Sequence, residues 1–129
     1  MIALLRSTDG NPDSRYEKYI NFLDVSNVKY LSICWDRNSD KFDDEKHVYY
    51  HVAAKFGEGF SNVKKIIGFN FFILKQLFKH RSNYSIIHAA DFDTVLPAIL
   101  MRLFYNKHVI YDIYDWYIDS RCINNYLII

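Results

Sequence analysis

The sequence predicts an α/β domain of Rossmann-like, three-layer architecture around a largely parallel sheet. The first observation is the order of its elements: short runs rich in Ile, Val and Tyr alternate with longer stretches of helical periodicity. The second is residues 85–117, which read as a strand, a short acidic loop, a helix and a second strand. A strand–helix–strand unit of this length joins parallel strands through a right-handed crossover, so a binding site is expected beyond the strands' carboxyl ends.

The first half of the chain contains three predicted strands and one helix. The strands are expected at residues 2–5, 28–35 and 47–53, where apolar or alternating runs lie between turn-forming segments. Ser14 is suited to cap a helix that continues to about Val25. The spacing of its apolar residues predicts one buried face, formed by Tyr16, Tyr19, Ile20 and Leu23.

The second half adds two helices and two strands, at residues 85–90 and 108–113. We expect Ser61 to cap a long helix that ends near Lys79. Its predicted core face consists of Val63, Ile66, Ile67, Leu74, Leu77 and Phe78. The next helix is expected to begin after a cap at Asp93 or Thr94, which would place Pro97 in its first turn.

Composition limits the possible functions. The chain has 129 residues, which suits one domain, and half of them are hydrophobic, which is enough for a packed core. Sixteen basic residues against fifteen acidic ones argue against nucleic acid as a partner. Cys34 and Cys122 lack zinc-site spacing, so we interpret them as reduced thiols of a cytoplasmic protein. No stretch is long and apolar enough for a membrane span, and residues 1–6 are too short for a signal peptide.

Several common nucleotide and hydrolase motifs are missing from the sequence. No G-x-G-x-x-G follows the first strand, which argues against an ordinary dinucleotide-binding fold. No phosphate-binding loop of the G-x-x-x-x-G-K-[ST] type and no G-x-S-x-G elbow are present. The chemistry must therefore come from other residues.

Carboxylates gather around the predicted ends of the last two strands: Asp91, Asp93, Asp112, Asp115 and Asp119. Carboxylates in such a place can bind sugar hydroxyls or act as a base. Asp93 is expected to cap a helix, and Asp112 to point outward or pair with a basic neighbour. Asp91 and Asp115 have no obvious structural task and are therefore the candidate catalytic residues. His88 and His108 lie on predicted strands, where a hydrogen-bonded core or edge histidine is commoner than a ligand.

The helix from Ser61 to Lys79 allows two interpretations. Phe69, Phe72 and Ile73 fall outside its predicted core face, and several lysines lie near them. The helix could be buried on two sides by the rest of the domain. It could instead be a cationic, aromatic helix resting on an anionic membrane surface, at the inner face of the cell membrane.

The end of the predicted crossover unit resembles a known family. Residues 86–117 read IIHAADFDTVLPAILMRLFYNKHVIYDIYDWY. This stretch resembles the N-terminal domain of the retaining family-four glycosyltransferases, which have two Rossmann-like domains in the GT-B architecture. Those proteins show a strand ending in His-Ala-x-Asp, a helix with Asp-Thr-x-x-Pro-Ala, and a strand ending in Tyr-Asp-x-x-Asp. The resemblance is good over residues 84–120 and extends to the first eighty residues in element order only.

The resemblance implies which residues contact the substrate. Asp9, Gly10 and Asn11 correspond to the family's glycine-containing first loop, near the donor phosphates and the acceptor. Asp91 corresponds to the loop after the fourth strand, which lines the acceptor cleft. Tyr114 and Asp115 occupy the place of a His-Asp pair in many members. This chain departs from the pattern in two ways, because Tyr114 replaces that histidine and the first loop lacks the family's frequent second glycine.

The resemblance also implies a function. The chain would be the acceptor-side half of a glycosyltransferase that moves a sugar from a nucleotide-sugar to a glycan or lipid-linked acceptor, in cell-surface polysaccharide synthesis. The nucleotide-sugar is a substrate held mainly by a donor domain that is absent from this sequence, and no cofactor or metal is expected. The chain alone should be inactive.

The last residues and the missing donor half leave two alternatives. The chain closes in an apolar run, residues 125–129, which is either a last element packed on the sheet or the opening of an element that has been lost. We expect a domain truncated at its C-terminal end. The alternative function is a non-catalytic subunit of a split glycosyltransferase, which binds the acceptor or recruits its partner to a membrane.

Overall fold

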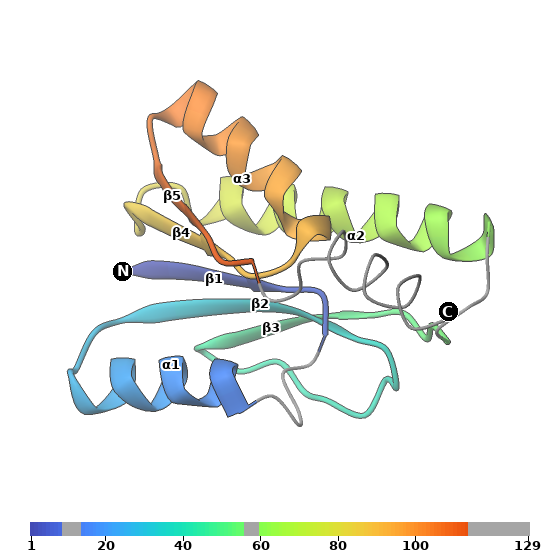
Figure 1. The fold of residues 1–129 in the computed structure, drawn as a ribbon, viewed down its shortest axis with the longest axis horizontal. Coiled ribbons are helices and arrows are strands. Elements are labelled where there is room, and N and C mark those ends of the chain that lie inside the picture. Colours follow the sequence, from blue (N-terminus) through green and yellow to red (C-terminus); the bar gives the residue numbers. More distant parts are fainter. Residues whose placement is uncertain (9–13, 56–59, 114–129) are drawn as a thin grey trace, which may run out of the picture.

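Five parallel strands form one sheet in the computed structural model, which describes residues 1–8, 14–55 and 60–113 (Figure 1). The strand order is β3-β2-β1-β4-β5, and every pair of neighbours is parallel. The strands are β1 (Ile2–Arg6), β2 (Tyr30–Asp36), β3 (His47–His51), β4 (Ile86–Ala89) and β5 (His108–Tyr111). The predicted α/β class, element order and parallel pairing are therefore confirmed.

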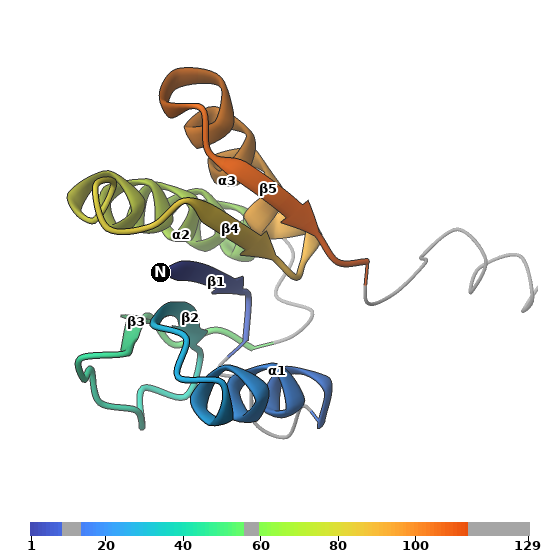
Figure 2. The same ribbon diagram turned by 90° about the vertical axis from the view of Figure 1, so that its left-hand side faces the viewer.

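Three helices make the two outer layers of the described structure. α1 (Ser14–Val25) lies on one side of the sheet, and α2 (Phe60–Lys79) and α3 (Phe92–Tyr105) lie together on the other (Figure 2). β1 leads into α1 and β4 leads into α3, so two neighbouring strands send their chains to opposite sides. Such a reversal leaves a crevice outside the carboxyl ends of the two strands.

The larger core lies between the sheet and α2 and α3. Trp35 of β2 is fully buried there, with its ring centroid 5.1 Å from that of Phe69 and 5.6 Å from that of Tyr50. Its indole N–H donates to the Val52 carbonyl at 2.8 Å, so burial leaves no polar group of the ring unsatisfied. This aromatic cluster fixes α2 against the β2–β3 half of the sheet.

The predicted core face of α2 was wrong in part, because only Leu77 of its six members is fully buried. Phe69, Ile73 and Leu77 are the fully buried residues, whereas Val63, Ile67 and Phe78 are about half exposed. The helix carries apolar side chains on nearly every face, so its periodicity does not select one of them. The aromatic cluster makes the selection, and Gly68 allows the close approach, because a Cβ there would collide with the Tyr50 hydroxyl.

The smaller core lies under α1 and follows the prediction. Tyr16 and Leu23 are buried, and Tyr19 and Ile20 are partly buried on the same face. The Tyr16 hydroxyl forms a short hydrogen bond with the Ser32 hydroxyl and lies 3.4 Å from the Cys34 sulfur. Burial raises the pKa of Tyr16, so the phenol stays protonated. Cys34 is buried in this core, and Cys122 lies outside the described residues, so the predicted state of the two thiols stays a prediction.

Some helix starts differ from the predictions. α2 begins at Phe60, so Ser61 lies inside the helix instead of before it. α3 begins at Phe92 with Asp91 as its N-cap residue, not Asp93 or Thr94, and Pro97 therefore falls in the second turn. The Thr94 hydroxyl, which donates to the Asp91 carbonyl at 2.7 Å, fixes this earlier start.

Candidate functional site

The candidate site lies at the carboxyl ends of β1 and β4, where the sheet order reverses. A cavity of about 370 Å³ opens there, lined by Ser7, Asp91, Phe92 and Asp93. Ser7 directly follows β1, and the other three residues form the loop after β4 and the first turn of α3. The crossover unit therefore supplies most of the lining, in the region the sequence had predicted.

Asp91 joins the two strand ends. The Arg6 guanidinium donates to Asp91 Oδ1 at 2.7 Å, and the Ser7 backbone N–H donates to Oδ2 at 2.8 Å. The Arg6 side chain is almost buried and that of Asp91 is one-fifth exposed. We had expected Asp91 to have no structural task, and that expectation was wrong. Its carboxylate is held in an orientation that leaves it at the wall of the cavity.

Arg37 brings a second cation to the same edge. It follows the carboxyl end of β2, its Nε donates to the Ser7 carbonyl at 3.2 Å, and its guanidinium lies 4.1 Å from the Trp35 ring centroid. Burial lowers the pKa of Arg37, and the charges of Asp93 and Asp91 oppose that shift. Packing on the ring and bonding to the backbone hold the side chain in a defined position.

Asp93 is the carboxylate whose ionisation the site opposes. Burial raises the pKa of Asp93, the nearby Asp91 charge raises it further, and only Arg37 acts in the other direction. The charges of Asp91 and Arg37 therefore act on Asp93 in opposite directions. A carboxylate with a raised pKa in a cavity is suited to exchange a proton or to hydrogen-bond a hydroxyl.

Arg6 and Arg37 were not among the site residues predicted from the sequence, and Asp93 was predicted to be a helix cap. A simple signal was available for the two arginines, since Arg6 is the last residue of β1 and Arg37 follows the last residue of β2. Polar residues at strand ends in a parallel sheet share one edge. Their pairing with Asp91 and Asp93 depends on strand order, which the sequence does not state.

A second polar cluster lies on the α1 side of the sheet. The Tyr19 hydroxyl donates to Asp112 Oδ2 at 2.7 Å, and His88 Nε2 lies 3.7 Å from the same oxygen. The Tyr19 and His88 rings meet edge to face with centroids 5.0 Å apart. Burial lowers the pKa of His88, against the opposing charge of Asp112. Asp112 was expected to point outward or to pair with a basic neighbour. It accepts its hydrogen bond from the Tyr19 hydroxyl, and His88, a packed strand residue, lies beside it.

The other predicted site residues cannot be placed. Asp9, Gly10 and Asn11 lie outside the described residues, as do Tyr114 and Asp115. Among the residues that the structure describes, no group of three or more His, Cys, Asp or Glu side chains could hold a metal ion.

Comparison with known proteins does not assign the chain to a family. No family model matches it, and no curated protein matches it either.

Proposed function

We propose that this chain is the acceptor-side domain of a retaining glycosyltransferase of GT-B architecture. It would bind a glycan or lipid-linked acceptor while a sugar is transferred from a nucleotide-sugar, in cell-surface polysaccharide synthesis. The observation that carries the proposal is the position of Asp91. Residues 88–91 match the family's strand end His-Ala-x-Asp, and Asp91 corresponds to its acceptor loop. Asp91 lies where the strand order reverses, beside the cavity and in contact with Arg6.

The geometry suggests a separate role for each charged residue of the site. Asp93 and Asp91 supply carboxylate oxygens toward the cavity, and such oxygens accept hydrogen bonds from sugar hydroxyls. Arg37 places positive charge at the same edge, where it would favour an anionic group of the acceptor or the departing diphosphate. The ion pair of Arg6 with Asp91 keeps the cavity wall in register with β1. Asp115 remains the second candidate catalytic residue, from the sequence alone, because it lies outside the described residues.

The proposal also predicts inactivity of the chain by itself. Transfer in a two-domain cleft requires that donor and acceptor be held together and that the departing diphosphate be stabilised. A donor-binding domain, in the same chain or a separate one, would supply the nucleotide-sugar site. Sugar transfer by the purified 129-residue chain would contradict this part of the proposal.

Acceptor binding can be tested without the donor domain. We would titrate the isotope-labelled protein with a panel of neutral oligosaccharides and follow backbone amide shifts. The largest shifts are expected at Ser7, Asp91 and Asp93, and Asp93→Asn should weaken binding by about tenfold or more, because it removes a charged acceptor. Asp40→Asn, in the exposed loop after β2, is the matched control and should bind like the wild type. If no oligosaccharide shifts these amides, the acceptor-site proposal fails.

The second candidate function is a non-catalytic, acceptor-binding subunit of a split glycosyltransferase. It is favoured by the same site and by a resemblance that covers an acceptor-side domain only. The two candidates differ in where the donor domain is encoded. Co-purification with a separate donor-domain protein would favour the split subunit, whereas a donor domain in the same reading frame would favour the two-domain enzyme.

A further inference from the structure

The outer face of α3 is a continuous apolar stripe. Phe92, Leu96, Ile99 and Leu103 follow one another at intervals of four, three and four residues, which places them on one side of the helix. Three of the four side chains are more than 60% exposed, and Ile99 is 43% exposed. Large apolar residues exposed singly are ordinary, but a stripe along a whole helix indicates an interaction surface.

α2 presents a second stripe, which contains both apolar and cationic residues. Lys64, Ile67, Phe71, Lys75 and Phe78 recur every three or four residues, so all five lie on one side of the helix. Phe71 is 68% exposed, and Ile67 and Phe78 are about half exposed. This side points away from the core contacts of Phe69 and Ile73.

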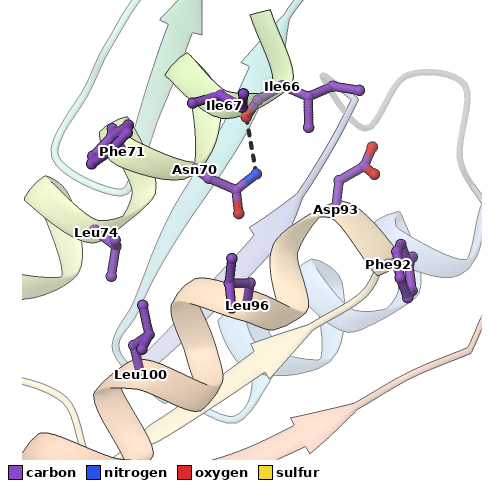
Figure 3. Close-up of a pocket in the computed structure, with 9 residues that line it drawn as sticks. All are labelled: Ile66, Ile67, Asn70, Phe71, Leu74, Phe92, Asp93, Leu96 and Leu100. Carbon is purple, nitrogen blue, oxygen red and sulfur yellow. Dashed lines mark hydrogen bonds between the residues drawn. The ribbon is translucent and has the colours of Figure 1, made fainter. Parts of the chain in front are cut away.

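A groove of about 440 Å³ joins the two stripes (Figure 3). Its walls are apolar side chains of both helices, and Asn70 and Asp93 are its two polar lining residues. The Asn70 side-chain amide donates to the Ile66 carbonyl at 2.9 Å, so part of its polarity is already satisfied within α2. The groove with its two stripes, termed here the α2–α3 surface, consists of Lys64, Ile66, Ile67, Asn70, Phe71, Leu74, Lys75, Phe78, Phe92, Asp93, Leu96, Ile99, Leu100 and Leu103.

The charges around this surface are mostly positive. α2 contains four lysines at positions 64, 65, 75 and 79 and no acidic residue in its sequence. α3 adds Arg102, and Asp93 is its one carboxylate. The chain as a whole is nearly neutral, with a net charge of +1, so this face is distinctly more basic than the average surface. An anionic partner is favoured here over a neutral or cationic one.

We propose that the α2–α3 surface docks on an anionic phospholipid bilayer, with Phe71, Phe92 and Leu96 inserted among the acyl chains. Lysines on the flanks of such a face extend their ammonium groups toward lipid phosphates while their stems cover apolar surface. In the described ranges, no helix is long and apolar enough to cross a membrane. Binding at the interface uses exposed side chains that the fold already presents. The inference is independent of the proposed glycosyltransferase activity.

The test is flotation of the 129-residue chain with phosphatidylcholine vesicles, with and without phosphatidylglycerol. Binding is expected to the anionic vesicles at low salt and to weaken as salt is raised. Lys64→Gln combined with Lys75→Gln should lower the partition coefficient by about tenfold or more, because each lysine close to an anionic membrane contributes to the free energy of binding. Phe71→Ser should also weaken binding, and it should do so at every salt concentration because the lost interaction is apolar.

Matched controls exist on α1 and in the segment between α1 and β2. Phe22 is 68% exposed, the same fraction as Phe71, so Phe22→Ser removes an equally exposed ring from another face. Lys18→Gln combined with Lys29→Gln removes two exposed charges away from the α2–α3 surface. Both controls should bind vesicles like the wild type, and circular dichroism of all variants checks their folding.

Three results would overturn the proposal. The first is wild-type protein that ignores anionic vesicles at low salt. The second is an equal loss of binding in the control variants, which would indicate non-specific attraction. The third is a concentration-dependent dimer, seen by light scattering, that Phe71→Ser abolishes while vesicle binding is unaffected, since a second copy would then be the occupant. A failure of acceptor binding with intact vesicle binding would reject the proposed function alone.

Discussion

Arg6 and Asp91 form an ion pair of 2.7 Å between residues 85 positions apart in the sequence. Arg6 is the last residue of β1, and Asp91 is the N-cap residue of α3 after β4. The pair therefore links the carboxyl ends of β1 and β4, the two neighbouring strands whose chains continue to opposite sides of the sheet. It also fixes one wall of the candidate site, so the stability of the edge and the shape of the site depend on the same contact.

Asp91→Asn should destabilise the protein by about 2 kcal/mol, because it removes the negative charge that the nearly buried Arg6 guanidinium contacts at 2.7 Å. Urea denaturation measures this loss as a lower midpoint. Asp24→Asn is the control, since Asp24 pairs with Lys46 at 2.6 Å but both side chains are exposed. Water screens that pair, and a much smaller effect is expected. Equal losses in the two variants would show that burial does not strengthen the Arg6 contact.

Gly68→Ala should destabilise the native protein by about 1 kcal/mol or more, because the new methyl group collides with the Tyr50 hydroxyl. Tyr50 cannot easily withdraw, as its ring packs on Trp35, Phe69 and Phe72. In a Tyr50→Phe background the hydroxyl is gone, and the same change should become neutral or stabilising, as alanine favours helix over glycine. A double-mutant cycle by urea denaturation gives the coupling, and a value near zero would refute the collision.

His51 should make stability depend on pH. Its Nδ1 lies 3.0 Å from Asp36 and its Nε2 lies 3.2 Å from Asp43, and the hydrogen bond to Asp36 raises the pKa of His51 above 6.5. The contribution of protonated His51 is therefore fully present below its ordinary pKa and is lost as the pH rises through the raised value. His51→Gln should remove this dependence, at a cost of at most about 1 kcal/mol in acid, because the side chain is 40% exposed.

The titration of His51 can be followed directly by its ring proton resonances. The midpoint should lie above 6.5 and should fall in Asp43→Asn, which removes one of the two carboxylates. A wild-type midpoint at or below the ordinary value would contradict the prediction.

Asp93→Asn should stabilise the protein at neutral pH. Burial raises the pKa of Asp93 above its ordinary 3.8, so the folded state keeps a proton that the unfolded state has released. Stability then falls as the pH rises from 3.8 through the raised value, and the penalty remains at higher pH. Denaturation midpoints of wild type and variant should differ most at pH 7 and converge in acid. A variant less stable than the wild type at pH 7 would show that Arg37 dominates the environment of Asp93.

The sequence predicted the strands and α1 well because their signals are local. Apolar runs between turn formers set the strands, and one apolar face on α1 predicted the burial of Tyr16 and Leu23. α2 was different, because its apolar residues surround the helix and several faces could have become the core. The choice of Phe69 and Ile73 depended on aromatic residues of β2 and β3, outside the helix itself.

The sequence by itself determined the fold class, the order of the elements and the edge of the sheet at which a site should form. These follow from periodicity and chain order, which act over a few residues at a time. Only the tertiary structure decided which side chains meet there. Arg6 and Arg37 approach Asp91 and Asp93 because β1 lies between β2 and β4, and strand order results from long-range packing that no local pattern encodes.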